Sequence, residues 1–149
     1  MDVREYRDAL RSVLESTEAE TLRRLGLISR AAAEADIEEI VLDLFVDDDA
    51  EGPFDVWARF EGESVFVTQQ RLGDERQLVD VVWTESGWEP PVPDRPSGWT
   101  RADLQEALVD VVAEWLTALL PTGAADRVWV LQTPDGEIDP RELRRPGRT

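Results

Sequence analysis

Apolar residues recur every three or four positions along the first 35 residues, which is the spacing that one face of an α-helix requires. The pattern predicts a helix over residues 2–16, with an apolar face formed by Val3, Tyr6, Leu10, Val13 and Leu14. The pattern is interrupted at Ser16–Thr17, and the acidic residues Glu18 and Glu20 favour the first turn of a new helix. A second helix is therefore expected to continue to about Ala35.

From residue 37 the apolar period changes to two, which is typical of β-strands. The first strand directs one set of apolar side chains to one face: Ile40, Leu42, Leu44 and Val46. The second strand does the same with Phe54, Val56, Ala58 and Phe60. Further strands are predicted over 64–70 and 77–84. Because short turns join these four strands, an antiparallel meander is expected.

Residues 87–99 contain four prolines, which exclude a helix or an inner strand and indicate a stiff connector. Thr100 and Asp103 then have the spacing of a helix capping motif. The helix that follows has an apolar face formed by Leu104, Ala107, Leu108, Val111, Trp115, Leu116 and Leu119. A short strand over 128–132 is expected to complete the sheet.

These elements predict an α+β fold. An antiparallel sheet of four or five strands carries the N-terminal helix pair and a C-terminal amphipathic helix on one face, and its other face is partly open. The chain length of 149 residues suits one domain. This domain is expected over residues 1–140, and the arginine-rich segment 141–149 is expected to be frayed.

The composition argues against catalysis, because the chain contains no Cys, no His and no Lys. The absence of Cys and His removes the thiolate nucleophile, the commonest general base and the usual transition-metal ligands. No glycine-rich phosphate-binding motif is present. We therefore expect a protein that is not an enzyme, with no catalytic residue, no metal site and no cofactor.

The N-terminal residues 1–5 are polar and charged, so they do not resemble a signal peptide. The longest apolar stretch, 104–120, is interrupted by Glu106, Asp110 and Glu114, and it is too polar to cross a bilayer. The protein is therefore expected in the cytoplasm.

The net charge is −17 at pH 7, and the acidic residues concentrate in the middle of the chain. Residues 36–63 hold eleven acidic residues and a single arginine. This charge disfavours nucleic acid and anionic membranes as partners. Two interpretations of the acidic middle remain: it maintains solubility, or it steers a basic protein partner towards the surface.

One candidate partner-binding group lies on the open sheet face and its first turn, where aromatic side chains stand among carboxylates. Aromatic rings supply contact area and carboxylates steer cationic surfaces. The group comprises Asp43, Phe45, Asp47, Asp49, Asp55 and Trp57. The alternative is that the proline-rich connector folds back and covers these aromatic residues.

A second candidate group is a row of carboxylates on the helix that begins near residue 100. Its members are Asp103, Glu106, Asp110 and Glu114. The spacing of three and four places them on one helical face, where like charges repel by roughly 0.2–0.5 kcal/mol per pair. No arginine lies between Arg101 and Arg127 to compensate them. The row is either a plain solvated face or a contact surface for a basic partner.

The acidic segment 47–52 has the composition of a calcium-binding loop. However, the twelfth position of such a loop would be Ala58, where a bidentate Glu is required, and the flanking segments are strands. A solvated hairpin turn is therefore predicted instead.

Two segments together resemble a known but uncharacterised family. They are Gly52-Pro53-Phe54-Asp55-Val56-Trp57-Ala58-Arg59-Phe60, and Gly87-Trp88-Glu89-Pro90-Pro91 leading through Gly98-Trp99 into the long helix. They resemble a domain of unknown function found in small acidic proteins of actinobacteria, and the resemblance spans most of the chain. It implies no activity and no site residues. A small acidic α+β domain is also similar in type to the immunity proteins that neutralise bacterial toxins.

The sequence thus favours a non-enzymatic acidic protein that docks a basic protein surface, as an inhibitor or immunity-type partner. One alternative is a self-associating or structural domain that forms a homo-oligomer and whose acidity serves solubility. The other is a metal-dependent hydrolase that uses carboxylates alone.

Overall fold

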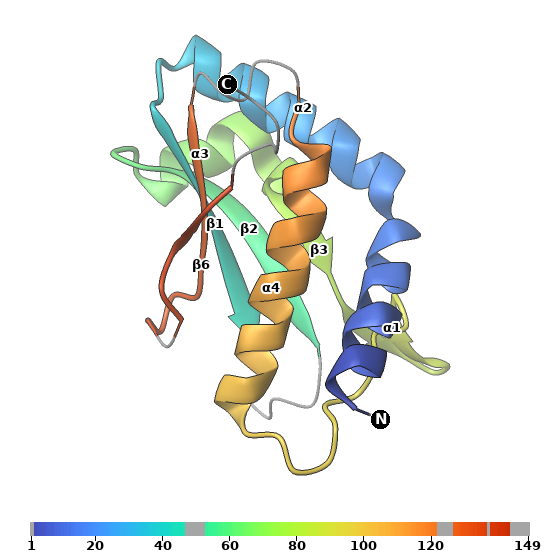
Figure 1. Ribbon diagram of the computed structural model, residues 1–149. Coiled ribbons are helices and arrows are strands. Elements are labelled where there is room, and N and C mark those ends of the chain that lie inside the picture. The colour runs from blue at the N-terminus through green and yellow to red at the C-terminus, as the bar shows by residue number, and fades with distance from the viewer. Residues whose placement is uncertain (1, 47–52, 122–126, 137, 144–149) are drawn as a thin grey trace.

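The structure of the protein is a computed structural model that describes residues 2–46, 53–121, 127–136 and 138–143 (Figure 1). The helices of the described residues are α1 (Val3–Glu15), α2 (Glu18–Glu34), α3 (Val65–Leu72) and α4 (Arg101–Leu119), with a 3₁₀ turn η1 (Gly73–Arg76). The strands are β1 (Glu39–Val46), β2 (Phe54–Phe60), β3 (Gln77–Asp80), β4 (Val82–Thr84), β5 (Gly87–Glu89), β6 (Val128–Gln132) and β7 (Arg141–Glu142).

The main sheet has the strand order β3-β2-β1-β6-β7, and β4 and β5 form a separate hairpin. β1 pairs antiparallel with β2, from Ile40 opposite Phe60 to Val46 opposite Phe54, but it pairs parallel with β6. The α+β class is confirmed, whereas the expectation of a purely antiparallel sheet was wrong. The reason is the long connection through α4, which lets the chain enter β6 in the same direction as β1.

Residues 64–70, predicted as a strand, instead lie mostly in α3. The Ser64 side chain accepts a hydrogen bond from the Val67 backbone N–H at 3.2 Å and caps the helix, and Gly73 ends it at a φ of 58°. Val65 and Val67 alternate as the residues of a strand would, but both are exposed. With no sheet face for these valines to cover, the local cap determines the structure.

The predicted strand 77–84 is divided into two. β3 joins the edge of the main sheet, whereas β4 pairs with β5, so that Trp83 lies opposite Trp88. The two indole rings pack edge to face with centroids 4.9 Å apart. The first residues of the proline-rich connector are therefore one strand of a hairpin.

The predicted start of the long helix is confirmed. The Thr100 side chain accepts a hydrogen bond from Asp103 N at 3.1 Å, and the Asp103 carboxylate accepts one from Thr100 N at 2.9 Å. α2 likewise begins at Glu18, directly after the break predicted at Ser16–Thr17. α4 begins where side chains bond to the free backbone N–H groups of the first helical turn. α2 begins where acidic residues interact favourably with the positive amino end of the helix dipole.

α4 crosses one face of the sheet, with α1 and α2 beside it (Figure 1). The predicted apolar face of α4 is buried, but so are Val109, Val112 and Ala113 outside that face. The helix is therefore covered on more than one side, because α1 and α2 pack against it as well as the sheet. It is also not the C-terminal element, since β6 and β7 follow it.

The core lies between these helices and the inner face of the sheet. Every second residue of β2 points into it, as the period of two predicted: Phe54, Val56, Ala58 and Phe60. The largest side chains with full burial include Trp115 of α4, Trp129 of β6 and Tyr6 of α1. Among the described residues, no helix has both the length and the apolar character that spanning a membrane requires.

Candidate functional site

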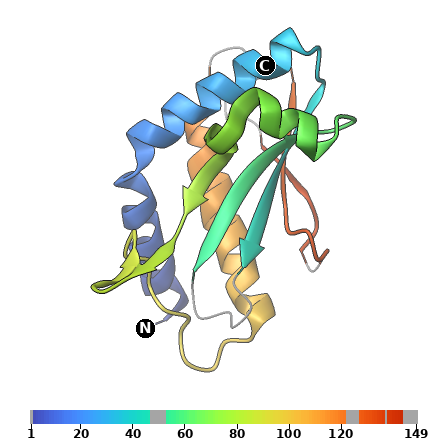
Figure 2. The ribbon, with the colours of Figure 1, turned by 180° about the vertical axis from the view of Figure 1, so that it is seen from behind.

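Figure 2 shows the sheet from the side opposite α4, with β1 and β2 in front. Asp43 of β1 points to this outer face, yet it is only 8% exposed. One of its oxygens accepts a hydrogen bond from Arg59 Nε at 2.8 Å, and the other accepts one from Gln132 Nε2 at 3.1 Å. Asp43 therefore ties β1 to both neighbouring strands, and this pairing leaves it little charge to offer a partner.

Three other side chains of the outer face form what we call the acidic strand end: Phe45, Asp55 and Asp80. Phe45 of β1 is opposite Asp55 of β2, and Asp55 is opposite Asp80 of β3. Phe45 is 43% exposed, Asp80 is exposed and Asp55 is half-buried. Beside them is a hollow of about 100 Å³ whose lining includes Phe45 and Asp55. Two carboxylates and an exposed aromatic ring thus meet at one end of the sheet.

Trp57 lies next to the acidic strand end and is half-buried. Its Nε1 donates a hydrogen bond to Asp55 at 3.1 Å, and the Arg76 guanidinium lies over its ring, 5.2 Å from Cζ to the ring centroid. Arg76 is held there by the Ala58 carbonyl at 2.9 Å and the Gln69 side chain at 2.7 Å. Burial lowers the pKa of Arg76. The side chain that covers Trp57 thus comes from η1.

The carboxylate row on α4 divides into two parts. Asp110 accepts hydrogen bonds from Arg7 of α1, at 2.7 Å, and from Arg141 of β7. Glu114, one turn further, accepts one from Arg11 of α1 at 2.8 Å. Arginines four residues apart on α1 therefore meet carboxylates four residues apart on α4, and we call these two ion pairs the α1–α4 ladder.

The other two members of the row lie nearer the amino end of α4. The Asp103 carboxylate caps the helix, and Glu106 is exposed. The repulsion expected along the row is thus compensated at Asp110 and Glu114 by arginines that are distant in sequence.

Asp47 and Asp49 lie outside the described residues. Within the described part of the chain, no group of three or more acidic side chains is arranged to hold a metal ion.

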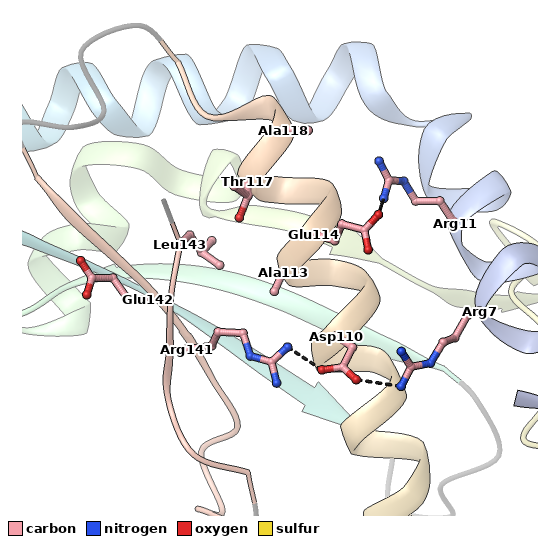
Figure 3. A pocket seen from close by; sticks show the side chains of 10 residues that line it. All are labelled: Arg7, Arg11, Asp110, Ala113, Glu114, Thr117, Ala118, Arg141, Glu142 and Leu143. Atoms are coloured by element: carbon pink, nitrogen blue, oxygen red, sulfur yellow. Dashed lines mark hydrogen bonds and ion pairs between the residues drawn. The ribbon is translucent and has the colours of Figure 1, made fainter. Parts of the chain in front are cut away.

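The α1–α4 ladder forms one wall of an open pocket of about 670 Å³ (Figure 3). Arg7 and Arg11 lie on one side of α4 and Arg141 on the other, with Asp110 between Arg7 and Arg141. Small side chains of α4, Ala113 and Ala118, are also part of the lining. We call this site the arginine pocket.

Four members of these sites were not predicted from the sequence: Arg7 and Arg11 of α1, Arg141 of β7, and Asp80 of β3. The spacing of four between Arg7 and Arg11 matches the spacing of four between Asp110 and Glu114, and this match was the available signal. No comparable signal identified Asp80, because its position depends on the pairing of β3 with β2.

These features define an acidic α+β protein with a mixed sheet, an outer sheet face that carries carboxylates, and an arginine-lined pocket on the helical side. The chain belongs to a family of unknown function, DUF6389, whose model matches residues 1–147. The expected membership of an uncharacterised family is confirmed. Because the function of the family is unknown, its membership assigns no activity to this chain. No curated protein and no solved structure matches the chain.

Proposed function

We propose that the protein is a non-enzymatic binding protein that docks a basic protein surface at the acidic strand end, as an inhibitor or immunity-type partner would. The observation that carries the proposal is the placement of Asp55 opposite Asp80 beside the exposed ring of Phe45.

Like charges directly opposite each other on neighbouring strands destabilise a sheet. A lysine or arginine of a partner that binds between Asp55 and Asp80 would offset this repulsion. Phe45 adds an apolar contact, since exposed aromatic rings are frequent anchors of protein interfaces. The net charge of −17 would speed the approach of a basic protein.

The test begins with capture of proteins from a lysate of the source organism at low salt. Each captured protein is then purified, and its association rate is measured over a series of salt concentrations. Four forms of the present protein are compared: wild type, Asp55→Asn/Asp80→Asn, Phe45→Ala, and the control Asp8→Asn/Glu34→Gln. The control removes the same charge from exposed positions on α1 and α2.

Electrostatic steering predicts an association rate that falls steeply as added salt shortens the Debye length from about 10 Å at 0.1 M. The Asp55/Asp80 variant should bind more slowly and more weakly than the control variant. Phe45→Ala should mainly raise the dissociation rate, because it removes a contact and not a charge. A salt-independent association rate, or equal losses in the two double variants, would contradict the proposal.

Self-association is a second candidate, and a different surface favours it. The first turn of α3 exposes three consecutive apolar side chains, Val65, Phe66 and Val67, with Phe66 exposed to 71%. Two copies of a chain with a charge of −17 repel each other, so association through this turn should increase with salt. The solution mass at low and high salt, for wild type and Phe66→Ser, tests this candidate. For the carboxylate-based hydrolase, no observation on the described residues offers comparable support.

A further inference from the structure

We propose that the arginine pocket binds a small molecule that carries two or more carboxylate or phosphate groups. This site lies on the side of the sheet that carries α4, so it is separate from the acidic strand end (Figures 1 and 3).

The pocket holds more hydrogen-bond donors than the protein's own acceptors use. A guanidinium has five N–H donors, and three guanidinium groups line this pocket, from Arg7, Arg11 and Arg141. Among the described residues, each of them makes one hydrogen bond, to Asp110 or to Glu114. The Nε atoms of Arg7 and Arg11 are buried with no hydrogen-bond partner in this part of the structure, and the Nε of Arg11 lies 3.7 Å from a carboxylate oxygen of Glu15 in an ion pair. The lining also holds three carboxylates, of Asp110, Glu114 and Glu142. The guanidinium donors that make no hydrogen bond to them would be satisfied by a ligand rich in acceptor oxygens.

The convergence of these arginines is unusual for this chain, which holds 33 acidic and 16 basic residues. Arg7 and Arg11 approach from α1, and Arg141 approaches from β7 on the opposite side of α4. The planar guanidinium fork matches the geometry of carboxylate and phosphate groups. A volume of about 670 Å³ is in the range of small-molecule sites. Guanidinium groups on both walls favour a ligand with an anionic group at each end.

The existing ion pairs do not prevent such binding. The side chain of Glu114 is 77% exposed, so it can leave Arg11 and turn to solvent at little cost. Asp110 has two arginine partners and keeps Arg7 when a ligand takes Arg141. The ligand thus replaces Glu114 as the partner of Arg11 at one wall, and it replaces Asp110 as the partner of Arg141 at the other.

Isothermal titration calorimetry with citrate and with inorganic phosphate, in a chloride buffer, tests the proposal. Arg141→Gln removes one donor fork and one of the two arginine partners of Asp110, but it leaves both ion pairs of the α1–α4 ladder in place. Its matched control is Arg30→Gln, an exposed arginine of α2. We expect citrate to bind the wild type, and Arg141→Gln to weaken binding about tenfold, the effect of losing a charge-assisted hydrogen bond. Arg30→Gln should leave the affinity unchanged.

A second pair of variants changes the affinity in the other direction. Glu114→Gln removes the carboxylate that competes for Arg11, so it should strengthen citrate binding several-fold. Glu106→Gln removes an equal charge from the same helix outside the pocket and should have little effect. A gain in affinity cannot result from misfolding, which keeps the test decisive if Arg141→Gln is unstable.

Three results would overturn the proposal. They are no heat of binding with either anion up to about 10 mM, equal losses in Arg141→Gln and Arg30→Gln, or no gain in Glu114→Gln. The Asp55→Asn/Asp80→Asn variant should bind citrate as the wild type does, so this site and the acidic strand end can fail independently.

Discussion

Asp55 of β2 and Asp80 of β3 lie directly opposite each other, on the sheet face away from α4. The core-facing pair beside them, Val56 and Val79, is buried, so the two carboxylates project from the same strands as well-packed apolar side chains. The repulsion between them is therefore imposed by the register of the sheet, which the core determines.

Asp80→Asn should stabilise the protein, because it removes this cross-strand repulsion while keeping the shape of the side chain. We expect a gain of about 0.2–1 kcal/mol in the free energy of unfolding. Urea denaturation at low salt provides the measurement. The gain should shrink in high salt, and Glu85→Gln, an exposed carboxylate of the β4–β5 connection, should not reproduce it. A gain of equal size in Glu85→Gln would show that only net charge matters.

The two rungs of the α1–α4 ladder should differ in strength. Asp110 is half-buried and accepts from two arginines, whereas Glu114 is largely exposed. Double-mutant cycles to Ala should give a coupling of up to about 1 kcal/mol for Arg7 with Asp110, and less for Arg11 with Glu114. Chemical denaturation of the single and double variants measures both couplings. A stronger coupling for Arg11 with Glu114 would mean that solvent exposure does not determine the strength of these ion pairs.

Tyr6→Phe should be neutral or mildly stabilising, although Tyr6 is fully buried. Its hydroxyl oxygen is buried with no hydrogen-bond partner among the described residues, and burial raises the pKa of Tyr6. Removing an unpaired buried hydroxyl removes its desolvation cost, whereas the ring keeps its contact with Trp99 at a centroid distance of 5.1 Å.

Thermal denaturation compares Tyr6→Phe with Leu10→Ala one turn further along α1. Leu10 is fully buried, so its truncation should cost about 2–5 kcal/mol. A loss above about 1 kcal/mol in Tyr6→Phe would indicate that the hydroxyl makes a hydrogen bond in solution.

Glu20 should stabilise the folded protein at neutral pH but not in strong acid. Hydrogen bonds from Arg23 and Arg24 lower the pKa of Glu20 from 4.5 to about 2. A carboxyl whose pKa is lowered by folding stabilises the folded state above its unfolded pKa, and this contribution is lost as the pH falls from 4.5 towards 2. The effect is small, because the side chain is about half exposed.

Melting temperatures of wild type and Glu20→Gln, measured from neutral pH down to about pH 2, give the contribution of Glu20 to stability. The difference between the two should be constant above pH 4.5 and should disappear near pH 2. Glu34→Gln, on an exposed position of the same helix, controls for general charge effects. A difference that does not change with pH would exclude the ion pairs as its source.

The sequence predicted the elements whose signals are local. The capping pair Thr100 and Asp103 located the start of α4, and the alternation along β2 assigned its inner face correctly. α3 was missed because two β-branched residues suggested a strand, whereas a single serine cap determines the helix. The position of β6 beside β1 was also missed, since a parallel pairing leaves no turn sequence between its partners.

The candidate sites were harder to predict, because their geometry depends on residues that are distant in sequence. Asp43 was correctly placed on the outer face, but Gln132 and Arg59 cover its charge. Arg7 lies 103 residues from Asp110, so no spacing rule within α4 could assign this partner. Composition predicted an acidic protein, and tertiary pairing decides which of its carboxylates remain available.

The parallel pair of β1 and β6 has a consequence for synthesis on the ribosome. β1 occupies the middle of the sheet, yet one of its two neighbours begins only at Val128. A nascent chain that ends before this residue therefore exposes one edge of β1, with unpaired backbone groups that can recruit another strand. Pairing with β6 closes this edge, so the central strand can complete its hydrogen bonding only after Val128–Gln132 has emerged from the ribosome.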